Sequence, residues 1–131
     1  MQIHESAENY LETILMLSKK LPVVRSVDIA NELDFKKSSV SIAMKNLREG
    51  GKITVTQAGY IYLTDSGRAI AEMIYERHEW LTNWLISLGV DSSIAAEDAC
   101  KMEHVISKDC FKIVFGRFMY LHKQTSCVKY I

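Results

Sequence analysis

The chain contains few residues that break helices, with one proline and six glycines among 131 residues. This scarcity predicts long helices joined by short loops. No run of 18 apolar residues occurs, so we expect no transmembrane helix. The first ten residues, MQIHESAENY, lack a basic region followed by an apolar core, so we expect no signal peptide. The apolar fraction of 48% is enough for a packed interior and excludes a disordered chain.

The motifs of common catalytic sites are missing as well. The sequence has no glycine-rich phosphate loop, no HExxH motif and no candidate set for a Ser-His-Asp triad. Its three cysteines are an odd number without CxxC spacing, which indicates reduced thiols rather than disulfides. We therefore expect a cytoplasmic protein that is not an enzyme.

The charges are balanced in number but not in position. The chain has 16 Lys and Arg against 16 Asp and Glu. Residues 36–52 carry five basic residues and one acidic residue, a local excess of four positive charges. Acidic residues predominate in the first 17 residues and again in residues 89–109. The basic segment suits a polyanionic partner, although the same lysines could simply keep a small helical domain soluble.

Helical periodicity and turn residues predict the N-terminal elements. Apolar residues recur with helical spacing over residues 5–20. Ser26 is a favourable N-cap for a short helix over residues 27–33, and a third helix is expected over residues 38–51. The next segment predicts a β-hairpin with its turn at residues 57–59. This order of elements is typical of a winged helix-turn-helix domain.

The remainder of the chain is predicted to be helical. Thr64 is expected to cap a long helix over residues 65–88, which is followed by a helix over residues 93–106. Ser107 is expected to cap a last helix. The apolar side of that last helix would comprise Cys110, Ile113, Val114, Phe118 and Leu121.

The fold class is therefore mainly α, with a two-stranded β-hairpin wing. We place the domain boundary within the long helix, near residue 70. The domains are then a winged-helix DNA-binding domain, 1–70, and a helical domain, 71–131. The long helix also carries a stripe of large apolar residues, which fits either a dimer seam or internal core. The stripe consists of Trp80, Leu81, Trp84, Leu85 and Leu88.

The third helix is the expected DNA-reading element, because the second helix of such a pair lies in the major groove. If Val40, Met44 and Leu47 face the core, the residues between them face outward. Hydroxyl and lysine side chains there can contact phosphates, and Ile42 can meet a thymine methyl group. The residues predicted to bind DNA are Lys36, Lys37, Ser38, Ser39, Ser41, Ile42 and Lys45.

A second candidate site lies in the stretch DACKMEHVIS. Cys100, Glu103 and His104 stand at positions i, i+3 and i+4, so a helix places them on one face. A thiolate, a carboxylate and an imidazole together suit a divalent first-row transition metal rather than Ca²⁺ or Mg²⁺. Without further context, a buried cysteine beside a solvated Glu-His pair is an equally ordinary explanation.

The chain resembles the metal-dependent transcriptional repressors of the diphtheria-toxin-repressor and manganese-transport-regulator family. The resemblance runs from Ser6 to about Ser107. It is carried by ENYLETILML, VDIANEL, SSVSIAMKNLREGG, YIYLTDSGRAIA, ERHEWL and, most specifically, DACKMEHVIS.

The resemblance implies a homodimer that binds a pseudo-palindromic operator in double-stranded DNA when a metal corepressor is bound. The helical domain would then serve metal binding and dimerisation, without the SH3-like third domain of longer members. The metal ligands that the resemblance implies are Glu12, His78, Cys100, Glu103 and His104, with Asn9 at a further ligand position.

Four positions differ from the iron-type pattern, the manganese-type pattern or both. Iron-sensing members have methionine where this chain has Asn9, whereas manganese sensors have aspartate there and glutamate in place of Cys100. A thiolate ligand disfavours Mn²⁺ relative to Fe²⁺, so we expect Fe²⁺ to be favoured and Mn²⁺ to be possible, with Co²⁺, Ni²⁺ or Zn²⁺ as surrogates. The ancillary metal site of iron-type members corresponds to Thr82 and Ala96 here, and is expected to be absent or rebuilt.

Three functions remain open at this point. The first is a metal-activated DNA-binding repressor that controls iron or manganese homeostasis genes. The second, motivated by Asn9, is a winged-helix regulator that binds DNA without metal because its site has decayed. The third is a small metalloenzyme, which would require an open coordination position and a separate general base.

Overall fold

The computed structural model describes residues 5–107 and 109–116 of the chain. The chain divides into two compact units, Met1–Arg77 and His78–Ile131. The division falls inside helix α4 (Asp65–Ser87), which contributes to both units. The predicted domain boundary near residue 70 lies in the same helix and stays a prediction.

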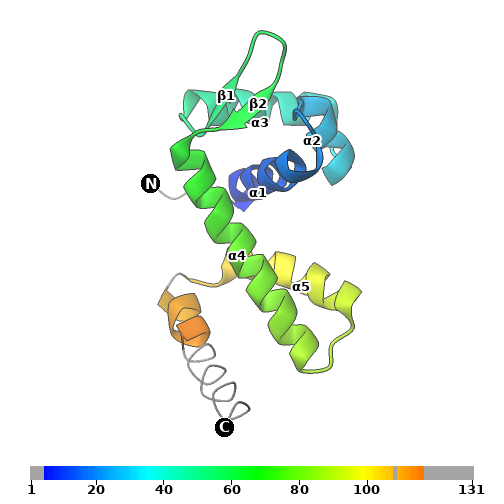
Figure 1. The fold of residues 1–131 in the computed structure, drawn as a ribbon, viewed down its shortest axis with the longest axis vertical. Coiled ribbons are helices and arrows are strands. Elements are labelled where there is room, and N and C mark those ends of the chain that lie inside the picture. The colour runs from blue at the N-terminus through cyan, green and yellow to red at the C-terminus, as the bar shows by residue number, and fades with distance from the viewer. Residues whose placement is uncertain (1–4, 108, 117–131) are drawn as a thin grey trace. The chain divides into compact units, whose positions relative to one another are not determined.

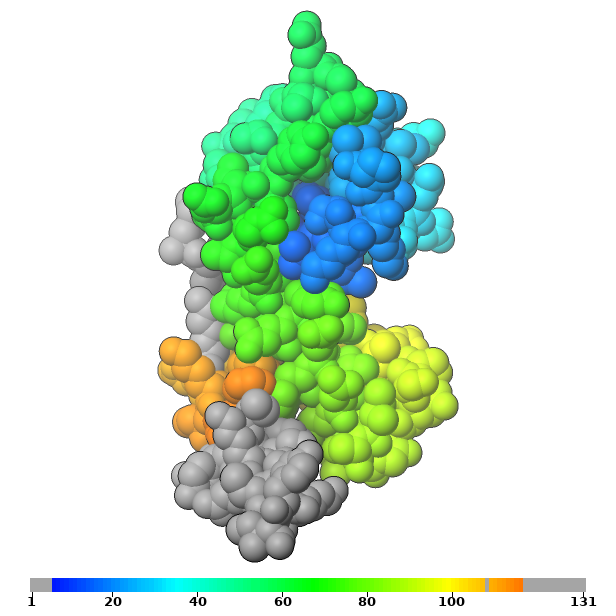
Figure 2. Space-filling view, viewed as in Figure 1, coloured from blue at the N-terminus to red at the C-terminus, as the bar shows by residue number. Residues whose placement is uncertain are grey.

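The first unit is a winged helix-turn-helix (Figure 1). Its helices are α1 (Glu5–Lys20), α2 (Ser26–Leu33) and α3 (Lys37–Glu49). They are followed by strands β1 (Ile53–Val55) and β2 (Ile61–Leu63), which pair antiparallel with Ile53 opposite Leu63. The turn between the strands projects from the surface of this unit (Figure 2). The mainly helical class and the hairpin wing are confirmed.

One core holds these elements together, because each helix and each strand buries apolar side chains in it. Helical periodicity assigns Val40, Ala43, Met44 and Leu47 to the inner face of α3; Val40, Met44 and Leu47 are buried, and Ala43 is partly buried. Burial of such side chains is the main stabilising contribution to a domain of this size. The buried residues of this core are Tyr10, Leu11, Ile14, Leu15, Leu17, Val24, Ile29, Ala30, Val40, Met44, Leu47, Ile53, Ile61 and Ala71.

The start of α2 differs from the prediction. Its N-cap is Arg25 rather than Ser26, which is the first residue of the helix. The Arg25 backbone N–H donates to Asp28 Oδ2 at 2.9 Å. The start of the helix is therefore held by an acidic side chain at its third residue, which accepts from the N-cap backbone, and not by a serine side chain that accepts from the first turn.

The caps of α4 and α5 agree with the sequence. The Gly67 backbone N–H donates to Thr64 Oγ1 at 3.1 Å, so Thr64 caps α4 as predicted. Helix α5 spans Ser92–Val105, and Asp91 accepts from the Ser93 backbone N–H at 3.2 Å. The Ser93 hydroxyl also donates to this carboxylate, and it is the largest cause that holds the pKa of Asp91 below its usual value.

The second unit contains α4 from His78 onward, α5, and a helical segment over residues 109–116. Ser107 caps this segment as predicted, since its Oγ accepts from the Cys110 backbone N–H at 3.1 Å. The core of the unit is formed by Trp80, Leu81, Ala99 and Phe111. Within the part of the chain that the structure describes, no helix has both the length and the apolar character needed to span a membrane.

The predicted apolar side of the last helix is wrong. Cys110 and Ile113 are exposed, and Val114 is 38% exposed. Phe111 and Phe115 pack instead against Trp80, at ring-centroid distances of 5.6 and 5.5 Å. Aromatic rings bury more area than the aliphatic side chains on the opposite side, which explains why they decide the orientation of the helix. Phe118 and Leu121 lie outside the described residues.

Candidate metal centre and nucleic-acid interface

The residues predicted to contact DNA lie on the outer face of α3, with Lys36 at its N-cap. Its buried positions alternate with exposed ones at helical spacing, so the remaining side chains point to solvent. Ile42 is 64% exposed, which is unusual for an isoleucine in a helix that packs against a core. The exposed residues on or next to this helix are Lys36, Lys37, Ser38, Ser39, Ser41, Ile42 and Lys45.

The N-terminus of α3 is suited to a phosphate. Lys36 is its N-cap, and no acidic residue lies in the first turn. Backbone N–H groups at a helix N-terminus and the helix dipole favour an anion, and the lysine charges act in the same direction. Phosphate contacts of this kind fix the register of a helix on DNA, and exposed side chains further along can then reach base edges.

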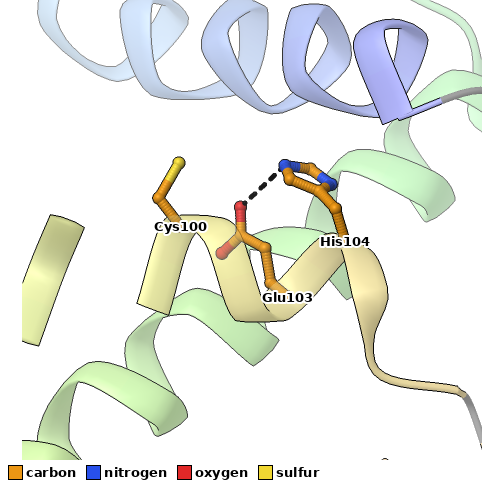
Figure 3. A group of neighbouring side chains, drawn as sticks. All are labelled: Cys100, Glu103 and His104. Atoms are coloured by element: carbon orange, nitrogen blue, oxygen red, sulfur yellow. Dashed lines mark ion pairs between the residues drawn. The ribbon is translucent and has the colours of Figure 1, made fainter. Parts of the chain in front are cut away.

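The metal candidates of the second unit lie on α4 and α5. Cys100, Glu103 and His104 leave α5 on the same side, as Figure 3 shows. One possible ligand atom from each of them lies within 4.8 Å of the other two. Ligands bound to one transition-metal ion at about 2.0–2.3 Å are separated by no more than about twice that distance. The helical spacing predicted from the sequence has therefore brought three ligand types to one place.

His78 is the fourth member of this cluster. It lies on α4, and its Nδ1 is 3.0 Å from Glu103 Oε2. The other carboxylate oxygen of Glu103 lies 3.3 Å from His104 Nε2 (Figure 3). Glu103 thus has an imidazole close to each of its oxygens. Carboxylates placed in this way commonly orient the imidazole rings of metal-binding histidines.

The burial of Glu103 is the main electrostatic feature of the cluster. Its side chain has no exposed surface, and the side chain of His104 is only 3% exposed. An ionised carboxylate at such a place is costly unless hydrogen bonds, positive charge or a metal ion stabilise it. Two imidazoles and a thiol around a buried carboxylate are a donor set that fits a divalent transition metal.

The two remaining predicted ligands lie in the first unit. Asn9 and Glu12 stand three residues apart on α1, so the helix places them on one face. The backbone oxygen of Asn9 accepts from the Thr13 hydroxyl at 2.8 Å. Participation of Asn9 and Glu12 in the metal centre stays a prediction.

Family models match both halves of the chain. Residues 2–59 match the DNA-binding domain of the iron dependent repressors, and residues 64–123 match their metal binding and dimerisation domain. The chain belongs to the iron-dependent repressor family. Its first unit is accordingly a DNA-binding domain, and the cluster on α4 and α5 lies in the domain that binds metal and dimerises. The family consists of metal-dependent transcriptional regulators, and this chain is one of them.

Individual relatives agree with this assignment. The chain is 33% identical over 105 residues to the transcriptional regulator MntR of Escherichia coli O6:H1, covering 80% of this chain and 68% of the relative. It is 33% identical over 118 residues to the HTH-type transcriptional regulator MntR of Shouchella clausii, covering 90% and 82%. A solved structure of a manganese-dependent transcriptional repressor in complex with manganese is similar with a TM-score of 0.77 at 26% identity. That match covers 85% of this chain and 51% of the solved chain, so the repressor with manganese is about twice as long as the matched region.

The contact between His78 and Glu103 joins residues 25 positions apart, and only the family resemblance had placed the two residues in one ligand set. Sequence interpretation missed Arg25, whose side chain reaches Tyr60 across 35 positions. The one available signal was the hairpin itself, which contains no basic residue between positions 53 and 63.

Proposed function

We propose that this chain is a metal-activated repressor that binds operator DNA as a homodimer and controls genes of metal-ion homeostasis. The cluster of Cys100, Glu103 and His104, with His78 in contact, carries the proposal. This cluster lies in a metal-binding and dimerisation domain that follows a DNA-binding domain. The protein would act in the cytoplasm, together with the DNA that it regulates, and the operator is expected to be pseudo-palindromic to match a two-fold dimer.

The ligands that we propose are Glu12, His78, Cys100, Glu103 and His104, with Asn9 as a further candidate. A bound divalent cation would supply the positive charge that a fully buried carboxylate needs. In that role Glu103 holds its two imidazole neighbours in place, while the thiolate of Cys100 selects among metals. If Glu12 and Asn9 are also ligands, metal binding fixes the position of α1. Because α1 packs in the core of the DNA-binding domain, the presence of metal can then affect DNA binding.

The donor set favours Fe²⁺ over Mn²⁺, and the matching family is that of the iron dependent repressors. A thiolate is a soft ligand, which favours Fe²⁺, Co²⁺, Ni²⁺ or Zn²⁺ over Mn²⁺ at an otherwise equal site. Among the solved relatives, one is a manganese-dependent repressor in complex with manganese and another holds Zn²⁺. We therefore propose Fe²⁺ as the favoured metal and Mn²⁺ as the second candidate.

Metal activation requires that the metal bind more tightly to the form that binds DNA. By linkage, the factor by which metal raises DNA affinity equals the factor by which DNA raises metal affinity. A typical coupling of about 1–3 kcal/mol corresponds to roughly a 5–150-fold gain in DNA affinity. The coupling free energy can therefore be measured in two ways, as the gain in DNA affinity on adding metal and as the gain in metal affinity on adding DNA.

A second candidate is a regulator that binds DNA without metal. Asn9 motivates it, because a neutral amide is a weaker ligand than the carboxylate or thioether found there in manganese-type or iron-type members. A small metalloenzyme is the third candidate, and the membership in a family of transcriptional regulators argues against it.

The deciding experiment measures DNA binding with and without Fe²⁺, Mn²⁺ and Zn²⁺, under anaerobic conditions for iron. Wild type is compared with Cys100→Ala and His78→Ala. Cys110→Ala is the matched control, since Cys110 is an exposed thiol in the same unit outside the cluster. We expect metal to raise the affinity of wild type and of the control, but not of the two cluster variants. Equal affinity for all proteins in all conditions would establish the metal-independent regulator instead, and metal-dependent hydrolysis lost in the cluster variants would establish the enzyme.

A further inference from the structure

The wing of this protein carries no charge of its own. Residues 53–63, which form both strands and the turn between them, contain no Lys, Arg, Asp or Glu. A wing that contacts the DNA backbone normally offers a cation, because neutralised phosphates supply most of the sequence-independent affinity. Lys52 lies at the base of the hairpin, where its Nζ donates to Ser66 Oγ at 2.6 Å. A cation for the outer part of the wing therefore has to come from another element.

The segment before α2 lies directly beside the wing. The Ile61 backbone N–H, at the start of β2, donates to the Val24 carbonyl oxygen at 2.8 Å. The next residue, Arg25, therefore stands next to the outer part of the hairpin. It is exposed, whereas Val24 is buried in the core of the unit.

The side chain of Arg25 is held against Tyr60 of the wing. Its guanidinium carbon lies 4.9 Å from the centre of the Tyr60 ring, and Nη2 donates to the Tyr60 hydroxyl at 3.2 Å. Tyr60 is itself fixed, because its backbone N–H donates to Thr56 Oγ1 at 3.0 Å across the turn. Cation–π and hydrogen-bond contacts of this kind restrict an otherwise flexible side chain.

The backbone of Arg25 is fixed as well. It is the N-cap of α2, and its N–H donates to Asp28 Oδ2 at 2.9 Å. Among the described residues no carboxylate forms an ion pair with the guanidinium. A guanidinium has five N–H donors in a planar fork that matches a phosphate, so one bond to a phenol oxygen leaves donors to bind an anion. Arg25 is thus an exposed, ordered cation, and the Asp28 carboxylate beside it bonds to its backbone N–H rather than to its guanidinium.

We propose that Arg25, positioned by Tyr60, is the phosphate contact of the wing, so that the start of α2 supplies the charge that the hairpin lacks. The ligand is the phosphodiester backbone of duplex DNA. This inference rests on the proposed DNA-binding function and adds a contact outside α3. Pre-ordering of the side chain reduces the entropy that is lost on binding.

The test is the salt dependence of DNA affinity for the full-length protein. Each phosphate neutralised contributes a slope of about −0.9 to log K against log salt concentration. We expect Arg25→Ala to reduce the magnitude of the slope by about 0.9 for each copy of the chain bound, with roughly tenfold weaker binding at low salt. Arg25→Lys should keep the slope, because it keeps the charge. Tyr60→Phe should also keep the slope, but weaken binding by less than about fivefold through poorer positioning.

The matched control is Lys112→Ala, which removes one exposed positive charge from the second unit and should leave the slope unchanged. Thermal unfolding of every variant checks that the fold is intact. A wild-type slope in Arg25→Ala overturns the inference and makes Arg25 a structural contact between α2 and the wing.

The titrations are repeated without metal on duplex DNA of unrelated sequence, where the phosphate contact is expected to persist. Loss of metal response in wild type therefore refutes the proposed function, while the Arg25 slope on unrelated DNA decides the inference separately.

Discussion

Glu103 on α5 and His78 on α4 form a hydrogen bond, with 3.0 Å between Oε2 and Nδ1. The carboxylate is completely buried and the imidazole is 21% exposed, so the bond lies at the edge of the interior of the second unit. A carboxylate in this position costs free energy that its neighbours must offset. Glu103 lies in a domain that binds metal. A buried negative charge there has a purpose if it binds a metal ion, even though it lowers the stability of the fold.

The first prediction concerns Glu103→Gln, which keeps the shape of the side chain and removes its charge. We expect affinity for Co²⁺, used as a surrogate, to fall by more than about tenfold, a loss that even partners outside the coordination sphere can cause. Without metal the variant should be at least as stable as wild type, because it no longer buries a charge. Isothermal titration and thermal unfolding with and without metal measure both effects. An unchanged Co²⁺ affinity would contradict the assignment of Glu103 to the metal centre.

The second prediction concerns metal choice. Cys100→Glu replaces a soft sulfur ligand by a hard oxygen ligand, the residue that manganese-type members have at this position. We expect the ratio of Mn²⁺ to Co²⁺ affinity to rise by about tenfold or more, since ligand type is one of the main determinants of metal selectivity. Competition titrations measure the ratio, and the thiolate-to-cobalt absorption band should vanish in the variant. Cys110→Ala should retain both the absorption band and the wild-type affinity ratio. Loss of the band in Cys110→Ala would show that Cys110, and not Cys100, is the sulfur ligand.

The third prediction separates base reading from phosphate binding on α3. Ile42→Ala should reduce discrimination between the operator and a sequence with its thymines replaced, by up to about tenfold, because it removes an apolar contact to a methyl group. Lys45→Ala should weaken binding to all sequences alike and reduce the salt slope by about one per bound chain. Titrations of both variants on matched and substituted duplexes test the difference. If the two variants respond identically, Ile42 does not contact a base.

Local patterns predicted the features that depend on local geometry. Apolar spacing predicted the order of the helices, and cap and turn residues predicted their ends to within about two residues. The i, i+3, i+4 spacing of Cys100, Glu103 and His104 predicted their convergence, because a helix fixes the direction of each side chain. His78 was identified only through the family resemblance, since nothing in its own helix indicates which residue of α5 it contacts.

Features that depend on packing between elements were missed. The last helix has apolar residues on more than one side, so periodicity alone could not decide between the face of Phe111 and the face of Cys110. The contact between Arg25 and Tyr60 depends on where β2 runs relative to the segment before α2, and that placement is a tertiary property. The N-cap of α2 was misplaced by one residue because Ser26 resembles a cap, while Asp28 supplies the hydrogen bond from inside the helix.

The fourth prediction concerns the junction between the wing and α4. A Cβ atom on Gly67 would lie 1.9 Å from the Lys52 backbone oxygen, and 2.9 Å from its carbonyl carbon. Backbone cannot move aside as the end of a side chain can, and the same Lys52 oxygen accepts from the Thr64 N–H at 3.1 Å. Gly67→Ala must therefore displace the start of α4 from the strand β1, with an expected loss of about 1–3 kcal/mol in the free energy of unfolding, as for other overpacked sites.

Gly116→Ala is the control for this prediction, because nothing lies within 4 Å of the Cβ that it would add. Alanine has the higher helix propensity, so this control should be neutral or stabilising by up to about 1 kcal/mol. Urea denaturation of the two variants compares the free energies of unfolding directly. Because the N-terminus of α4 follows the wing, Gly67→Ala should also weaken DNA binding even at saturating metal, whereas Gly116→Ala should not. Equal stability of the two variants would show that α4 can shift without cost, and the wing would then not be braced by this contact.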